Sequence, residues 1–246
     1  MTLNKSRVLF LGRKNEECCN KAYIFLKKKF SNVKVIWSKS PNEKNHLYFK
    51  KEFDYIFALR SYFILKKETL AKIKKAAINF HPAIPKYRGF APANYAILNS
   101  EIYYGCTAHI MHEKVDSGPI INVLRFKISK KDSLKKILLK TYAYQLKQFK
   151  TLISKIAKKE ESLLKFIEIS KKEKWGNKIK TKKDIDRLYE IDLKKSKIKI
   201  INHLRATLLE NSIFHPYLLL NNKRYLIIKD KEWKKINFMK IYEKLI

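Results

Sequence analysis

Two polar side chains, Asn79 and His81, stand two residues apart at the end of the apolar run 76–78. Two prolines, Pro82 and Pro85, follow at once, and each stiffens the chain because its ring fixes the backbone angle φ. We interpret this arrangement as a strand that delivers an amide and an imidazole to a cleft, with a rigid loop behind them.

A carboxylate, Asp116, precedes a Ser-Gly-Pro turn between the apolar segments 105–111 and 119–126. An acid ahead of a Gly-Pro turn between two strands is well placed to point into a cleft. We therefore expect one edge of the fold to present Asp116 together with Asn79 and His81.

These three groups suit acyl transfer to an amine. His81 can accept a proton as the amine attacks, because imidazoles titrate near neutral pH. Asp116 can orient His81 and stabilise the imidazolium, and Asn79 can donate a hydrogen bond to the oxyanion. Neither segment holds a serine or cysteine in a nucleophile-elbow context, which favours direct attack by a substrate amine over a covalent intermediate.

Each residue also has a structural interpretation. A histidine at a strand end is often a packing or surface residue, and an acid before a Gly-Pro turn is a common turn former. His109 and His112 are interpreted as packing or solvent-facing residues, and Cys106 as a small core residue. The combination of an amide, an imidazole and a carboxylate in one order is what favours chemistry.

The elements around these residues alternate between strands and helices. Strands are predicted at 7–11, 33–37, 53–59, 76–80, 105–111 and 119–126, and helices at 15–30, 66–75, 92–98 and 132–156. The alternation predicts an α/β fold with a mostly parallel sheet and helices on both faces. Ligands of such sheets bind at the carboxyl ends of the strands, where Asn79 and His81 are expected.

The polar and basic stretch 171–183 marks a domain boundary. We place a catalytic domain at residues 1–175 and a small C-terminal region at residues 176–246. That region is predicted to hold a helix at 196–209 and a β-hairpin at 217–228, with Asn221 and Asn222 in the turn.

Composition argues against several function classes. Only eight of the 56 basic residues are arginines, and the lysines are spread along the chain. We therefore interpret the net charge of +34 as solvated surface, and we expect no nucleic-acid partner. No apolar run approaches the roughly 18 residues of a transmembrane helix, and a signal-peptide pattern is missing, so no membrane partner is expected.

Cofactors and compartment follow from the glycines and cysteines. The stretch LGRKNE after the first predicted strand has a single glycine, which disfavours a nicotinamide or flavin cofactor. The three cysteines, Cys18, Cys19 and Cys106, indicate free thiols in the cytoplasm. The adjacent pair lacks the spacing of a zinc site, and no metal is expected.

The sequence around Asn79, His81 and Asp116 resembles that of the N10-formyltetrahydrofolate-dependent formyltransferases. That family's pattern runs Asn-x-His, a proline-rich loop, an Arg-Gly pair, Gly-x-Thr and Asp-x-Gly. It appears here as Asn79 with His81, the loop 82–89, Gly105 with Thr107, and Asp116 with Gly118. The resemblance implies a Rossmann-like formyltransferase fold, Asn79, His81 and Asp116 as the catalytic trio, and N10-formyltetrahydrofolate as co-substrate.

The resemblance also implies where folate binds. In the family the pocket is lined by the chain after the third strand, which is here LRSYFI at 59–64. The implied folate-binding residues are Leu59, Arg60, Tyr62, Asp116 and Gly118. The loop after His81 differs from the family's usual sequence, because it is one residue shorter and has Ala83 where serine is common.

The stretch 85–101 is most similar to family members that formylate amino sugars carried on nucleotides. The expected acceptor is therefore a nucleotide-linked amino deoxysugar, first a dTDP-4-amino-4,6-dideoxyhexose used in lipopolysaccharide O-antigen synthesis. The expected contacts are Lys86, Arg88 and Arg205 to the phosphates, Tyr87 to the base and Asn94 to a sugar hydroxyl. The hairpin at 217–228 is apolar on both faces, which predicts a homodimer.

Alternatives stay open at this point. Arg88 can instead pin its loop through backbone carbonyls, and Arg205 can be a solvent-facing helix residue. Methionyl-tRNA and glycinamide ribonucleotide formyltransferases share the motifs, although the tRNA enzymes carry a C-terminal barrel for which the short region after the boundary is too small. A basic RNA-binding protein on a degenerate scaffold would bind RNA in a salt-dependent way and would not bind folate.

Overall fold

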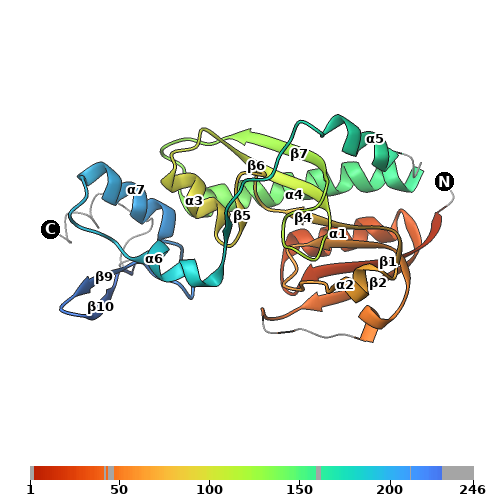
Figure 1. Cartoon of the computed structure of the whole chain (residues 1–246), viewed down its shortest axis with the longest axis horizontal. Helices are drawn as coiled ribbons and strands as arrows, with labels where there is room; N and C mark the ends of the chain where they lie inside the picture. The colour runs from red at the N-terminus through yellow and green to blue at the C-terminus, as the bar shows by residue number, and fades with distance from the viewer. Residues whose placement is uncertain (1–2, 42, 44–46, 159–161, 211, 229–246) are drawn as a thin grey trace. The chain divides into compact units, whose positions relative to one another are not determined.

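A computed structural model of the chain describes residues 3–41, 43, 47–158, 162–210 and 212–228. It divides into two compact units (Figure 1). The first comprises Met1–Arg88, Gly105–Phe126 and Thr141–Asn177, and the second comprises Gly89–Tyr104, Lys127–Lys140 and Lys178–Ile246. Each unit has its own hydrophobic core.

The first unit is built on a six-stranded sheet of order β2-β1-β3-β4-β6-β7. The strands are β1 (Asn4–Arg13), β2 (Phe30–Ser38), β3 (Phe53–Leu59), β4 (Ile73–His81), β6 (Tyr103–Ile110) and β7 (Ile120–Lys127). The pairs β1/β2, β1/β3 and β3/β4 are parallel, and β4/β6 is antiparallel. The predicted mostly parallel α/β sheet is confirmed.

Helices cover both faces of this sheet. On one face, α1 (Glu17–Lys27) and α4 (Leu134–Lys158) pack on alternate residues of the central strands, such as Phe10 and Phe57. On the other face, the short helices η1 (Leu47–Lys50) and α2 (Lys67–Leu70) contribute apolar residues that pack near Leu9 and Ile56. Strands buried on both faces have continuous apolar sequences, which explains why VLFL and YIFAL are uniformly hydrophobic.

Two of the predicted helices are shorter than expected, and one helix is additional. The predicted helix at 66–75 ends at Leu70, because Ile73 pairs with Phe53 of β3 and draws the following residues into β4. A further helix, α5 (Ser162–Ile169), follows α4 and was not predicted. The helix predicted at 15–30 is shorter, Glu17–Lys27, because β2 begins at Phe30.

The second unit packs α3 (Pro92–Leu98) against α7 (Lys197–Thr207). The hairpin of β9 (Tyr217–Leu220) and β10 (Lys223–Leu226) turns at Asn221 and Asn222, which both have positive φ. Asparagine tolerates that conformation, so the predicted hairpin turn is confirmed. The remaining elements are β5 (Arg88–Gly89), β8 (Ile179–Lys180), η2 (Lys182–Asp184) and α6 (Ile185–Tyr189).

The compact units do not follow one cut in the sequence. The chain crosses from the first unit to the second for the last time between Asn177 and Lys178, two residues after the boundary predicted between residues 175 and 176. The C-terminal region, however, shares its unit with 89–104 and 127–140. Contacts between α3 and α7 account for part of this difference, because they join segments about a hundred residues apart in the sequence.

Candidate active site

The strand β4 ends in the two polar side chains that the sequence singled out. Asn79 is half-buried and His81 is buried. The loop behind them is held down by Thr107, which donates a hydrogen bond from Oγ1 to the Ala83 carbonyl at 2.7 Å. This contact joins two parts of the motif, because Thr107 is also the residue paired with His81 across β4 and β6.

His81 and Asp116 form a buried pair. The distance from His81 Nδ1 to Asp116 Oδ2 is 3.3 Å, and the two side chains are 4% and 3% exposed. Asp116 has a φ of 48°, in the left-handed region that non-glycine residues rarely adopt. Backbone conformations of this kind concentrate at functional sites, where the surrounding structure holds them.

The protonation of His81 follows from its second contact. His81 Nε2 lies 2.7 Å from the Tyr87 carbonyl, and a carbonyl only accepts, so Nε2 carries a hydrogen. In neutral His81 the lone pair of Nδ1 therefore faces the Asp116 carboxylate. One proton can bind between His81 Nδ1 and Asp116 Oδ2. Burial lowers the pKa of His81, and the Asp116 carboxylate acts in the opposite direction.

His109 is a fourth member of the site, although the sequence predicts a packing or solvent-facing residue there. Its Nε2 lies 3.2 Å from Asn79 Nδ2 and 3.4 Å from Asp116 Oδ1. Its Nδ1 lies 2.7 Å from the Ile110 carbonyl and therefore carries a hydrogen, so Nε2 of the neutral ring can accept from the Asn79 amide. His109 thus orients Asn79 and shares Asp116 with His81.

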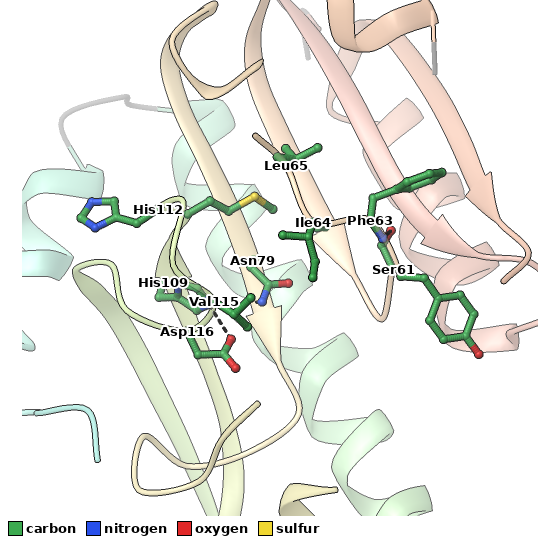
Figure 2. A pocket seen from close by; sticks show the side chains of 12 residues that line it. Ser61, Phe63, Ile64, Leu65, Asn79, His109, His112, Val115 and Asp116 are labelled. Carbon is green, nitrogen blue, oxygen red and sulfur yellow. Dashed lines mark hydrogen bonds and ion pairs between the residues drawn. The ribbon is translucent and has the colours of Figure 1, made fainter. Parts of the chain in front are cut away.

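A cavity of about 140 Å³ opens beside these groups (Figure 2). Asn79, His109 and Asp116 lie on its polar side. The rest of its lining comes mainly from the chain after β3 and from the β6–β7 connection: Ala58, Ser61, Tyr62, Phe63, Ile64, Leu65, Met111, His112 and Val115. A concave pocket in which polar groups converge beside apolar side chains is typical of a small-molecule site.

The residues predicted to bind folate are only partly in this cavity. Tyr62 and Asp116 line it. Leu59 is instead a fully buried core residue, and Arg60 donates to Glu16 at 2.7 Å and stacks on a tyrosine ring. Ile64 and Leu65, a few residues further along, line the cavity, whereas Leu59 and Arg60 are not among its lining residues. Folate binding by this segment stays a prediction.

Gly118 acts through its backbone. A Cβ atom at this position would collide with the Ile110 carbonyl, so only glycine allows the β6–β7 connection to close at this point. The Gly118 carbonyl accepts a hydrogen bond from the Trp175 indole at 2.7 Å. Gly118 thus supports the turn that carries Asp116.

The residues predicted for the acceptor in the loop after His81 have different surroundings. Lys86 is exposed, and its binding to phosphate stays a prediction. Tyr87 is buried, and its carbonyl accepts from His81, so its ring is not open for stacking on a base. Arg88 donates to the Gly176 carbonyl at 3.0 Å and reaches the Val115 carbonyl at 3.4 Å, which is the loop-pinning role considered above.

Asn94 and Arg205 serve the packing of the second unit. Asn94 is buried and donates to the Ala206 carbonyl at 2.7 Å, which ties α3 to α7. Arg205 is 8% exposed, and it donates to the Ser129 carbonyl at 3.1 Å, to two further carbonyls of that loop and to Asn202. These bonds engage the donors of Arg205 within the protein, which favours a structural role, and a contact of Arg205 with phosphate stays a prediction.

In the described part of the chain, no cluster of three or more histidine, cysteine or acidic side chains could hold a metal ion. Among the same residues, no helix has the length and apolar character that crossing a membrane requires.

Part of the chain is similar in sequence to curated proteins. The bifunctional polymyxin resistance protein ArnA of Wigglesworthia glossinidia brevipalpis is 31% identical over 132 residues, 53% of this chain and 19% of that protein. Matches to three curated relatives cover 19% to 32% of their lengths, so the chain spans only part of them.

Solved structures are similar over nearly the whole chain. A 4-N formyltransferase from Francisella tularensis has a TM-score of 0.70 at 20% identity, covering 94% of this chain and 99% of that one. An N-formyltransferase from Helicobacter canadensis, in complex with folinic acid and dTDP-3-aminofucose, has a TM-score of 0.62 at 21% identity, with coverages of 89% and 86%. At these identities the likeness is one of fold.

The family model described as formyl transferase matches residues 7–153 of the 246. This span contains Asn79, His81 and Asp116 and both strands that bring them together. The chain therefore belongs to the formyl transferase family.

Proposed function

We propose that the protein transfers a formyl group from N10-formyltetrahydrofolate to the amine of a nucleotide-linked amino deoxysugar. The observation that carries this proposal is the buried His81–Asp116 pair, whose Asp116 lines a cavity together with Asn79. Family membership supports formyl transfer as the reaction.

In the proposed reaction the neutral amine attacks the formyl carbon, and a carbon–nitrogen bond forms. The carbonyl oxygen becomes an oxyanion, to which Asn79 can donate a hydrogen bond. The ammonium proton passes to the place between His81 Nδ1 and Asp116, directly or through water. Collapse of the intermediate breaks the bond to N10 of the folate, and N10 takes up a proton, so that formamide and tetrahydrofolate are released.

The folate is proposed to occupy the cavity beside Asp116. Apolar side chains such as Phe63, Ile64 and Met111 can cover the faces of a flat pteridine ring, while Asn79 and Asp116 meet its polar edge and the formyl group. The residues present thus fit this co-substrate. The Helicobacter canadensis enzyme, whose complex holds folinic acid, is similar in fold and supports a folate as the co-substrate.

For the acceptor we propose a dTDP-linked amino sugar, because dTDP-3-aminofucose is the sugar in that same complex. The product would serve surface polysaccharide synthesis. We place the reaction in the cytoplasm, where the free thiols of Cys18, Cys19 and Cys106 would stay reduced. We also propose a homodimer through the β9–β10 hairpin, on which Leu219, Leu220 and Leu226 are exposed.

The proposal is tested with the purified protein, N10-formyltetrahydrofolate and a panel of acceptors. The panel contains dTDP- and UDP-linked 3-amino and 4-amino sugars, glycinamide ribonucleotide and methionyl-tRNA. Mass spectrometry should detect the gain of one formyl group on an amino-sugar nucleotide, and His81→Asn should abolish most of it. If only methionyl-tRNA or glycinamide ribonucleotide is formylated, the acceptor is not an amino sugar. If none of the amines is formylated, the proposed function is refuted.

A further inference from the structure

Trp175 touches both imidazoles of the site. Its ring centroid lies 5.0 Å from that of His109, with the ring planes at 88°, and 6.0 Å from that of His81, at 68°. Edge-to-face contacts at such distances are favourable for aromatic rings. Trp175 does not line the cavity beside Asp116, so it contacts the reactive groups without being part of the proposed folate pocket.

The segment that carries Trp175 is anchored to the loops on either side of the site. The indole N–H donates to the Gly118 carbonyl, in the connection that carries Asp116. The next residue, Gly176, donates its N–H to the Pro85 carbonyl at 3.0 Å and accepts from Arg88 at 3.0 Å. These three bonds hold the indole in one place against the two histidines.

An ion pair fixes the same segment from its other end. Glu173 accepts two hydrogen bonds from Arg125 of β7, both at 2.7 Å, in the bidentate geometry that is the strongest between these side chains. The segment 173–176 is therefore bonded to β7, to the β6–β7 connection and to the loop after β4. A residue that is held this firmly against the His81 and His109 rings can determine how these rings are oriented toward Asp116.

We infer that Trp175 is a positioning residue that holds His81 and His109 against Asp116 and keeps water from the proton shared by these three groups. The expected effect of Trp175 on the reaction rate rests on the proposed formyl transfer. Its expected effect on indole fluorescence rests on the geometry alone. The proton taken from the attacking amine would then stay within the site until it is needed.

The charged and polar groups around His81 decide the direction of the expected pH effect. Burial is the largest cause of the lowered pKa of His81, and the groups that face it are Asp116, the Tyr87 carbonyl, His109 and Arg88. On the Trp175 segment, the charge of Glu173 is engaged by Arg125. At 6.0 Å the attraction between the indole face and a protonated His81 is at the limit of its range, so the loss of burial should dominate when Trp175 is removed.

The first test compares Trp175→Ala with Trp175→Phe in single-turnover formyl transfer between pH 5 and 8. Trp175→Ala should lower the rate at the optimum by about 10-fold or more and move the acid limb to higher pH by about half a unit or more. Trp175→Phe keeps a ring and should leave the limb in place, with a rate reduced only about two- to five-fold. A residue that only stabilises the fold would lower the active fraction equally at every pH, so an unmoved limb in Trp175→Ala would overturn the inference.

The second test needs neither folate nor an acceptor. An adjacent imidazolium quenches indole fluorescence, so the emission of Trp175 should fall as His81 takes up a proton. The difference between wild-type emission and that of Trp175→Phe isolates this signal from Trp37 and Trp233. The midpoint should move to higher pH in His109→Gln, because His81 then loses the neighbouring ring that helps to lower its pKa.

The outcomes separate this inference from the proposed function. Emission of Trp175 that does not change with pH, or an identical midpoint in His109→Gln, would overturn the positioning role even if formyl transfer is observed. A shifted midpoint supports the role even if no tested amine is formylated. Should Trp175→Ala fail to fold, the fluorescence comparison still decides, because it uses only the two conservative variants.

Discussion

Asn79 and His109 lie directly opposite one another on the antiparallel strands β4 and β6, with Asn79 Nδ2 only 3.2 Å from His109 Nε2. One proton of the Asn79 amide is thereby directed at the imidazole, and the amide is fixed for donation to a ligand in the cavity that both residues line. A donor that is oriented before the substrate arrives loses little entropy in the transition state, which is the basis of oxyanion stabilisation.

Asn79→Ala should lower kcat by about 10²–10³, the usual effect of losing one oxyanion donor. Asn79→Asp is the matched variant, because it keeps the shape of the side chain and removes the donor. Steady-state kinetics with saturating folate measures both. An effect confined to KM would mean that Asn79 binds a substrate and does not stabilise the transition state.

His81→Ala should lower kcat by about 10²–10⁴, because the proton of the attacking amine loses its acceptor. In the wild type the rate should fall on the acid side, since His81 must be neutral to accept that proton. Burial lowers the pKa of His81, so the acid limb of kcat should have its midpoint below the ordinary histidine value of about 6.5. A rate that stays constant from pH 5 to 9 would contradict general-base catalysis.

Acid should destabilise the fold through its buried histidines. Burial lowers the pKa of His81 and of His203, whose Nε2 is bonded to the Leu188 carbonyl at 2.7 Å. Below about pH 6.5 the unfolded chain therefore binds more protons than the folded one, and stability is lost as the pH falls from that value through the folded-state pKa. Urea unfolding between pH 7.5 and 5 should show this loss, and His203→Gln should make the dependence shallower. Equal pH dependence in His203→Gln and wild type would remove His203 from the explanation.

Arg205→Met should destabilise the protein by about 2–4 kcal/mol, because several carbonyls of the loop 129–132 lose their donor in a buried site. Lys199→Met is the matched control, since Lys199 is an exposed residue of the same helix. Chemical denaturation measures the stability, and kinetics should find the KM for the sugar nucleotide unchanged in the folded fraction. A raised KM with unchanged stability would restore Arg205 as a phosphate ligand.

Leu219→Glu should convert the proposed dimer into monomers, because a charge would replace an apolar side chain that is 46% exposed on the β9–β10 hairpin. Lys223→Glu changes the charge on the neighbouring strand of the hairpin without removing apolar surface, and it should leave the dimer intact. Light scattering at micromolar concentration distinguishes the two states. A wild-type protein that is already monomeric under these conditions would refute the dimer.

Local patterns in the sequence were sufficient for the fold class and for the position of the catalytic groups along the chain. Uniform apolar runs such as 7–11 and 53–59 predict strands buried on both faces, and the change to helical spacing after residue 132 predicts α4. A strand that ends in Asn79 and His81 before a proline-rich loop places them at the carboxyl edge of a parallel sheet. The turn after Asp116 predicted the same edge for this carboxylate, the resemblance to a family agreed, and the structure brings Asp116 within 3.3 Å of His81.

The tertiary structure alone decided which further residues meet these groups. His109 faces Asn79 because β6 pairs with β4 in one register, and a shift by a single residue would have turned it to the other face of the sheet. Trp175 follows Asp116 by almost sixty residues, and Arg205 meets the loop 129–132 from a distant helix. Such contacts depend on how the whole chain packs, whereas spacing within a segment depends only on the geometry of one strand or helix.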